Sequence, residues 1–255
     1  MIGPVWQLFK ANIRQDSLIE STSIVCAAWR FVDEKRCHAV SVLDNERKFK
    51  KNVYDDEIVV KALHERLYDG VDILLHQNGD KFDIKKLNAR IAYYGLSPLP
   101  KIRTIDTLKQ VKKHFALDSN KLDFQGRFFG QGEKLETGGM DLWDNIIQMK
   151  YPPVGKQADM DLARKSVKHM VKYNKKDVDL LIDVYERIKP YIDLPNQFLY
   201  GDSAPFGCPH CGSMDRQKRG YSYTTVSRYQ RYQCKSCGKW YSDTKRDKGA
   251  VFKAA

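Results

Sequence analysis

Two cysteine pairs near the C-terminus constrain the fold of this chain more than any other feature. Cys208 pairs with Cys211, and Cys234 pairs with Cys237, each in the form Cys-x-x-Cys-Gly. Two such pairs supply the four thiolates of a tetrahedral Zn²⁺ site, and the glycines suit the tight turns that present them. In a reducing compartment this spacing indicates a metal rather than a disulfide. The sequence therefore predicts a zinc ribbon at about residues 205–242 with structural zinc. Redox disulfides are the alternative.

The segment between the cysteine pairs combines strand-like alternation with basic and aromatic residues. Residues 221–225 and 229–234 read as two strands of a small antiparallel sheet. Cations that bind phosphates and rings that stack on bases are how proteins hold single-stranded nucleic acid. We predict such contacts for Arg219, Tyr221, Tyr223, Arg228, Tyr229, Arg231, Tyr232 and Trp240. The alternative is that some of these rings form the small core of the ribbon.

The charge of the chain is unevenly distributed. Formal net charge is +12 with a pI near 9.3, and residues 201–255 hold 11 Lys and Arg against 4 Asp and Glu. A basic protein has a polyanion as its first candidate partner. Because the excess positive charge is concentrated in the C-terminal segment, it favours nucleic acid over a merely soluble basic surface.

Residues 1–195 read as an α/β domain, because strand-like and helical segments alternate along them. Strands are predicted at 22–32, 38–43, 71–75 and 102–108, and helices at 55–69, 84–95, 109–116, 119–129 and 157–189. A glycine-rich loop at 130–139 lacks phosphate-cradle spacing. Residues 243–255 read as a basic tail. No apolar run reaches membrane-span length, and the N-terminus lacks a secretory signal, so a cytoplasmic protein without membrane contacts is expected.

A polar corner follows the strand at 71–75. The corner runs from His76 to Gly79, and a helix with a regular apolar face follows it and ends at Gly95. In α/β folds, such a corner is where ligand sites usually lie. Asp83 lies in the first turn of this helix. It is either a metal ligand or a carboxylate that stabilises the positive end of the helix dipole.

The long helix at 157–189 carries a second candidate pair. Tyr173 and Asp177 are four residues apart, so they lie on one face of the helix, beside its apolar stripe. Two-metal phosphodiester hydrolysis needs several carboxylates around two Mg²⁺ ions that are roughly 3.5–4 Å apart. Asp83 and Asp177 come from different elements, as ligands of such a site do. A solvated helix surface is the alternative.

Four segments of the chain resemble the motifs of a known enzyme family. The segments HQNGDKFD, IDTL, SNKLDF and YNKKD, in this order, resemble the DEDDy-type 3′→5′ exonucleases of the ribonuclease H-like fold, particularly phage and bacterial members with a C-terminal zinc ribbon. Asn78, Phe82 and Asp83 match the second motif of that family, and Tyr173 and Asp177 match the third. The resemblance implies a mixed sheet flanked by helices, catalytic Mg²⁺ or Mn²⁺ held by Asp83 and Asp177, and a Tyr173 hydroxyl that orients water. It also implies that Asn78 contacts nucleic acid at a 3′ end.

One part of the family pattern is missing. The first motif of the family is Asp-x-Glu on an opening central strand, placed before a stretch like Gly3–Trp6, whereas the first acidic residues here are Asp16 and Glu20. Two of the four ligand carboxylates are therefore unaccounted for, and efficient two-metal hydrolysis is not expected. We expect a truncated exonuclease with impaired activity. Two alternatives stay open: a catalytically inactive nucleic-acid-binding protein, and a module whose ribbon docks a replication or repair protein.

Overall fold

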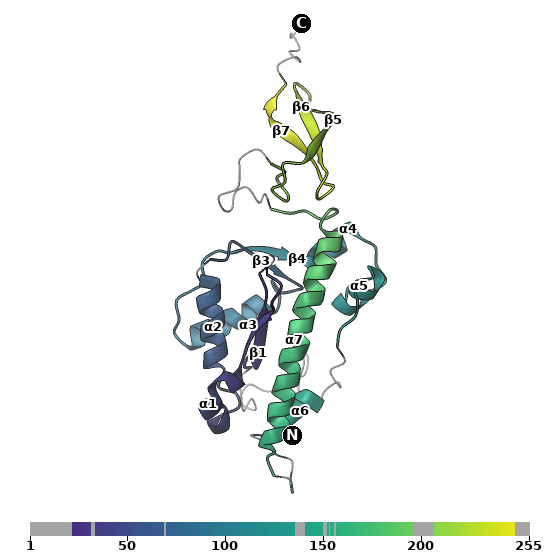
Figure 1. The fold of residues 1–255 in the computed structure, drawn as a ribbon. Coiled ribbons are helices and arrows are strands. Elements are labelled where there is room, and N and C mark those ends of the chain that lie inside the picture. Colours follow the sequence, from purple (N-terminus) through teal and green to yellow (C-terminus); the bar gives the residue numbers. More distant parts are fainter. Residues whose placement is uncertain are drawn as a thin grey trace. The chain divides into compact units, whose positions relative to one another are not determined.

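The computed structural model describes residues 22–31, 34–68, 70–135, 141–149, 152, 154–155, 157–195 and 207–247. The chain is mixed α/β, with small sheets and helices, as Figure 1 shows. It divides into two compact units. The first contains residues 1–106 and 119–184, and the second contains residues 107–118 and 185–255.

The strands of the first unit form two separate pairs. β1 (Cys26–Trp29) and β2 (His38–Ser41) are antiparallel. β3 (Ile73–His76) and β4 (Arg103–Asp106) are parallel, and His76 lies opposite Asp106. A parallel pair needs a crossover, which α3 (Asp83–Tyr93) provides. In the part of the chain that the structure describes, no strand joins the two pairs into the single mixed sheet predicted from the sequence.

Helices account for most of the remaining first unit. In addition to α3, they are η3 (Val42–Asn45), α1 (Glu46–Lys51), α2 (Glu57–Tyr68), α5 (Leu122–Phe128), α6 (Asp141–Ile147) and α7 (Met160–Ile188), whose end enters the second unit. The helices predicted at 55–69, 119–129 and 157–189 are confirmed as α2, α5 and α7. The sequence did not predict α1 and α6, because six and seven residues are too few to show helical periodicity. Gly95 follows α3 with φ +64°, as its predicted role as a helix terminator requires.

The main core of the first unit lies between the hairpin, α2 and α7, and Figure 1 shows β1 between these two helices. Its buried members are Val25, Val40, Val42, Phe49, Val53, Val59, Ile146, Ala163 and Val167. A smaller core of Val60, Leu87 and Ile91 joins α2 to α3. Both long helices are therefore held against strands by apolar side chains, which fixes the direction in which their polar faces point.

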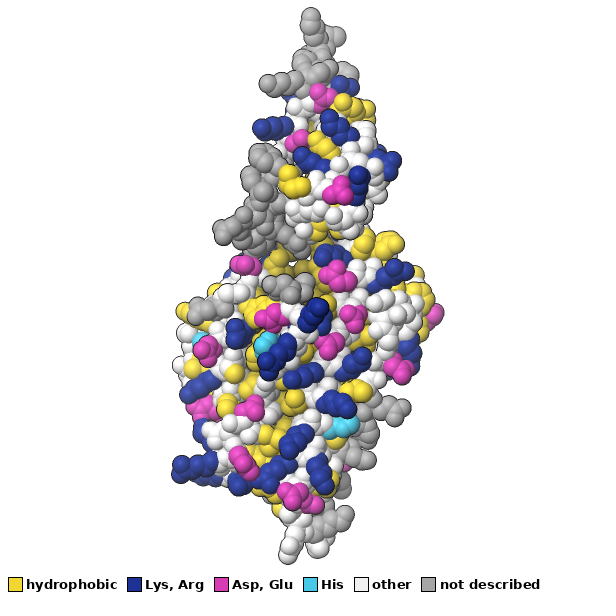
Figure 2. Space-filling view, viewed as in Figure 1, with side chains coloured by type: hydrophobic (Ala, Val, Ile, Leu, Met, Phe, Trp, Pro, Cys, Tyr) yellow, Lys and Arg dark blue, Asp and Glu magenta, His cyan; other side chains and the backbone are white. Residues whose placement is uncertain are grey.

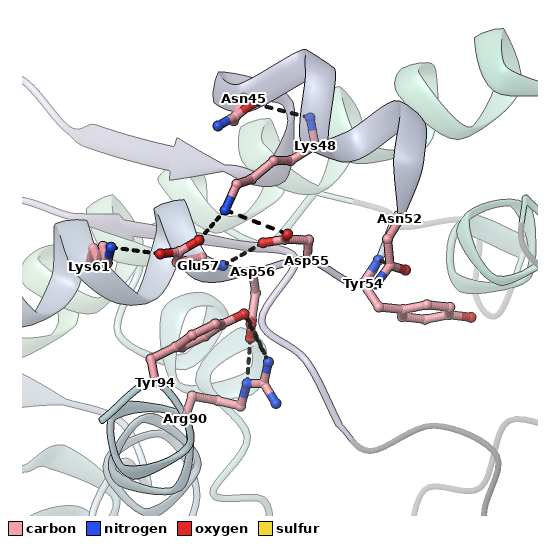
Figure 3. A network of polar contacts seen from close by, with 10 residues as sticks. All are labelled: Asn45, Lys48, Asn52, Tyr54, Asp55, Asp56, Glu57, Lys61, Arg90 and Tyr94. Carbon is pink, nitrogen blue, oxygen red and sulfur yellow. Dashed lines mark hydrogen bonds and ion pairs between the residues drawn. The ribbon is translucent and has the colours of Figure 1, made fainter. Parts of the chain in front are cut away.

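A buried carboxylate links three elements of this unit (Figure 3). Asp56 is fully buried and accepts hydrogen bonds from Ile24 N at 2.8 Å, Arg90 Nε at 2.8 Å and the Tyr94 hydroxyl at 2.6 Å. Figure 3 shows Arg90 of α3 and Tyr94, the residue after α3, reaching toward Asp56, which directly precedes α2. Burial, and then the bond to Asp56, raises the pKa of Tyr94 well above its usual range. The network fixes the position of α3, and hence of the corner before it.

We expect Asp56→Ala to lower the free energy of unfolding by about 3–5 kcal/mol, because it leaves the Arg90 guanidinium enclosed without a counter-charge. The matched control is Glu57→Ala, whose carboxylate is paired with Lys48 and Lys61 nearer the surface and should cost less than about 1 kcal/mol. Urea unfolding followed by circular dichroism measures both. Equal losses in the two variants would contradict this account.

The second unit contains α4 (Thr107–His114), the last turn of α7 and the ribbon. The ribbon sheet has the order β5 (Arg216–Tyr223), β6 (Arg228–Cys234) and β7 (Trp240–Arg246), all antiparallel. The strand predicted at 229–234 is confirmed within β6, and the strand predicted at 221–225 overlaps only the end of β5, at 221–223. β7 was not predicted, and it places residues 243–246 of the predicted tail in the sheet.

Several sequence predictions fall on residues outside the described ones. These are Gly3–Trp6, Asp16, Glu20 and the tail after residue 247. Among the helices that the structure describes, none is both long and apolar enough to cross a membrane.

Candidate functional site

The four ribbon cysteines form one cluster. The Sγ atoms of Cys208 and Cys237 are 3.7 Å apart, and those of Cys211 and Cys234 are 3.6 Å apart. A tetrahedral site with Zn–S bonds of about 2.3 Å requires Sγ–Sγ distances of about 3.8 Å. All four ligand atoms lie within 4.8 Å of one another, so the cluster is compatible with the structural zinc predicted from the spacing.

Glycines shape the two turns that present these thiols. Gly212 (φ +76°) donates its N–H to Cys208 O at 2.9 Å, and Gly238 (φ +74°) donates to Cys234 O at 3.0 Å. This left-handed conformation favours glycine over other residues. The predicted role of the glycine after each cysteine pair is therefore confirmed.

Burial and hydrogen bonding shift the pKa values of these thiols in different directions. Burial raises the pKa of Cys208 and raises that of Cys211 to about 11. Burial also acts on Cys234, but hydrogen bonds from Cys237 N, the Cys211 thiol and Ser236 N outweigh it and lower the pKa of Cys234 to about 7. These hydrogen bonds stabilise the Cys234 thiolate, which is the form that binds a metal. His210 is not part of the cluster among the described residues.

The corner after β3 is held by its own hydrogen bonds. Gly79 N donates to His76 Nδ1 at 3.0 Å, so the other ring nitrogen, Nε2, carries the proton toward Asp80 Oδ1, also 3.0 Å away. Asn78 N donates to Asp106 Oδ1 at 2.9 Å from a left-handed backbone with φ +63°. A Cβ on Gly79 would lie 2.6 Å from His76 Cγ, so only glycine fits there. These hydrogen bonds fix the conformation of the corner, which in turn positions Asp83.

Asp83 begins α3 beside this corner. Asp83 is exposed at the start of the helix. Desolvation by neighbouring protein atoms raises the pKa of its carboxyl, the nearby Asp106 adds to this rise, and the Asp83 backbone N–H and His76 oppose it. His76, Asp80 and Asp106 also place ligand atoms within 4.8 Å of one another. Sequence reasoning missed these three residues as a group. The available signal was that His76 and Asp106 end two strands that a parallel register brings side by side.

Tyr173 and Asp177 face the same cation, as their spacing predicted. Lys134 Nζ lies 2.6 Å from Asp177 Oδ2 and 3.0 Å from the Tyr173 hydroxyl. Asp177 Oδ1 is buried and has no hydrogen-bond partner among the described residues. Lys134 itself is fixed by its backbone N–H, which donates to Asp123 at 3.0 Å. No sequence pattern indicates a role for Lys134, which lies in the glycine-rich loop and contacts α7 only through the tertiary fold.

The structure does not place Asp83 and Asp177 in one ligand cluster. Among the described residues, two groups of three or more potential ligands could hold a metal: the four cysteines, and His76 with Asp80 and Asp106. Two Asp-x-Glu spacings occur, at 44–46 and 55–57, but both stand at helix starts rather than on a strand. Asp44 there accepts from Ser41 N, and Glu57 pairs with Lys48, so neither spacing supplies the first motif.

The ribbon residues predicted to contact nucleic acid differ in how exposed their side chains are. Tyr221 and Tyr232 are partly buried, and each lies 4.5 Å beneath a guanidinium, that of Arg228 and that of Arg216 respectively. Other predicted residues are exposed: Arg219, Tyr223, Arg231 and Trp240. Tyr229 is intermediate. Asn78 is in the first unit, where its backbone holds the corner.

Comparisons of the chain with protein-family models, with curated proteins and with solved structures give no match.

Proposed function

We propose that this chain is a metal-dependent 3′→5′ exonuclease-like protein of ribonuclease H-like fold that acts on nucleic acid. The observation that carries the proposal is that Tyr173 and Asp177 lie on one face of α7 and point to one place, where Asp177 Oδ1 is buried without a hydrogen-bond partner among the described residues. Asp83 and Asp177 would hold Mg²⁺ or Mn²⁺, which when bound would activate water and stabilise the leaving oxygen. The Tyr173 hydroxyl would orient that water, and the ribbon would hold the strand.

The arrangement of strands supports this fold. The β1–β2 hairpin is antiparallel and the β3–β4 pair is parallel, the two kinds of strand pairing that a mixed sheet flanked by helices combines. Asp83 follows the carboxyl end of the parallel pair, the edge at which open α/β sheets bind ligands. The proposed ligand therefore comes from the expected place in such a sheet.

A row of cations on α7 supports nucleic acid as the substrate. Lys165, Lys168, Lys172 and Lys176 are exposed, and none has an ion pair among the described residues. Successive members are three or four residues apart, or about 4.5–6 Å along the helix axis. Lys172 and Lys176 directly precede Tyr173 and Asp177. Figure 2 shows Lys and Arg side chains gathered over α7 on the visible face, where they would attract a phosphate backbone.

A second candidate function is nucleic-acid binding without cleavage, and Lys134 favours it. Its ammonium already neutralises Asp177 at 2.6 Å, where a catalytic metal would have to compete. The exonuclease family that the chain resembles also uses four carboxylates as metal ligands, and Asp83 and Asp177 match two of them. We therefore expect cleavage by this chain to be slow.

The polarity of degradation tests the proposal. A single strand labelled at its 5′ end should give a ladder of progressively shorter products with Mn²⁺ or Mg²⁺, and the same strand labelled at its 3′ end should release labelled mononucleotide at once. A ladder from the 3′-labelled strand, or internal cuts, would contradict 3′→5′ action. Tight binding without any cleavage would establish the second candidate instead.

A further inference from the structure

The ribbon sheet has two faces of different character. Residues directly paired on neighbouring strands share a face, and faces alternate along a strand. The cysteine face contains Cys234 with its paired residue Arg216, and Tyr232 with its paired residues Lys218 and Tyr241. Beyond the bulge after Lys218 it continues with the pairs Tyr221–Gln230 and Tyr223–Arg228. The tryptophan face contains the paired residues Gln217, Ser222, Tyr229, Arg231, Gln233, Trp240, Ser242 and Arg246. Arg219 lies in the bulge after Lys218, and its guanidinium lies beside the Gln217 amide on this face.

Contacts within the ribbon already occupy the cysteine face. The Arg216 guanidinium lies 4.5 Å from the Tyr232 ring centroid, and that ring stacks on Tyr241 at 5.5 Å. Arg228 forms an ion pair with Asp247 at 2.8 Å. Arg216, Tyr232, Tyr241 and Arg228 therefore serve the small core that a ribbon of this size needs, whereas Tyr223 is an exposed ring on the same face.

The tryptophan face is basic, and its main ring is open to solvent. Trp240 is 48% exposed, and the Arg231 guanidinium lies 4.8 Å from its ring centroid. Arg219, Arg231 and Arg246 are exposed, and none has an ion pair among the described residues. The residues paired on this face include no acidic side chain. Uncompensated cations beside an exposed indole complement a phosphate backbone with unstacked bases.

We infer that the tryptophan face binds single-stranded nucleic acid, with Trp240 stacking on a base and Arg219, Arg231 and Arg246 contacting phosphates. The inference rests on the proposed function only in taking nucleic acid as the partner. The contact between Arg231 and Trp240 orders both side chains before binding. The Gln217 and Gln233 amides, hydrogen-bonded to each other at 3.1 Å, add polar groups on the same face.

Matched substitutions on the two faces test the inference. Trp240→Ala should weaken binding of a labelled oligothymidylate or oligouridylate about tenfold, as loss of one stacked base does. Its control is Tyr223→Ala, which removes a ring 71% exposed on the cysteine face and should change affinity less than about twofold. Arg231→Gln should lower the salt slope by about 0.7, whereas Lys218→Gln on the cysteine face should leave it unchanged.

Fluorescence anisotropy without Mg²⁺ or Mn²⁺ measures binding apart from cleavage, and the zinc content of each variant shows that the ribbon is intact. Equal losses from Trp240→Ala and Tyr223→Ala, or unchanged affinity in zinc-loaded Trp240→Ala, would overturn the inference. Binding that is indifferent to salt would also overturn it, in favour of a protein partner. A chain that binds through this face but never cleaves would refute the exonuclease alone.

Discussion

Cys208→Ser is expected to abolish zinc retention and to unfold the β5–β6–β7 sheet. Of the described ribbon residues between 207 and 247, only Gly207, Cys208, Ser227 and Cys234 are buried, so the sheet has little apolar core of its own. Structural zinc binding contributes about 10–16 kcal/mol in small zinc domains, and a site that loses one of four thiolates loses much of that. Hydrogen exchange across residues 216–246 and the zinc content of the purified protein measure the effect.

The control for this variant is Cys37→Ser, which removes a cysteine outside the cluster and should keep its zinc. Zinc should also be lost as the pH falls, because burial raises the pKa of Cys208 and Cys211 and protons then compete with the metal. If Cys208→Ser retained one zinc per chain and unchanged exchange protection, the four-cysteine site would be refuted.

Asp83→Asn and Asp177→Asn should each slow metal-dependent cleavage by about a thousandfold, because each removes several kcal/mol of charge stabilisation at 1.36 kcal/mol per tenfold. The amide keeps the size of the side chain, so binding of single strands should stay within about twofold of the unchanged chain. Asp183→Asn, at an exposed position of α7, is the control and should cleave normally. Normal cleavage by Asp177→Asn would remove this carboxylate from the mechanism.

Features of this protein that depend on residues close together in the sequence could be predicted. Features that depend on contacts between residues far apart in the sequence could not. Spacing predicted the cysteine cluster because both turns are built within four residues, and i, i+4 spacing placed Tyr173 and Asp177 on one face. Lys134 was missed because its contact with Asp177 spans 43 residues and depends on how a loop returns to α7. His76 meets Asp106 only through the register of β3 and β4.

The ribbon shows the same distinction. Alternation predicted that its rings would divide between two faces, but not which face would be open, because that depends on the Cys234 pairing and on the Arg228–Asp247 ion pair. The single mixed sheet expected from the family resemblance appears as two separate strand pairs in the described residues. Short motifs that resemble those of a family predict only the local structure around each motif. Contacts between residues outside the motifs determine which strands pair.

Mn²⁺ binding tests most directly whether Asp83 and Asp177 serve one metal site, because it does not depend on how fast the chain cleaves. Electron paramagnetic resonance of free Mn²⁺ gives the affinity of the zinc-loaded chain, of each Asn variant and of the double variant. Each single variant should bind Mn²⁺ at least roughly 10- to 100-fold more weakly, because removing even an outer-shell partner of a metal ligand costs that much affinity. The two losses of affinity should be non-additive in the double variant. Unchanged Mn²⁺ affinity in both single variants would contradict the account.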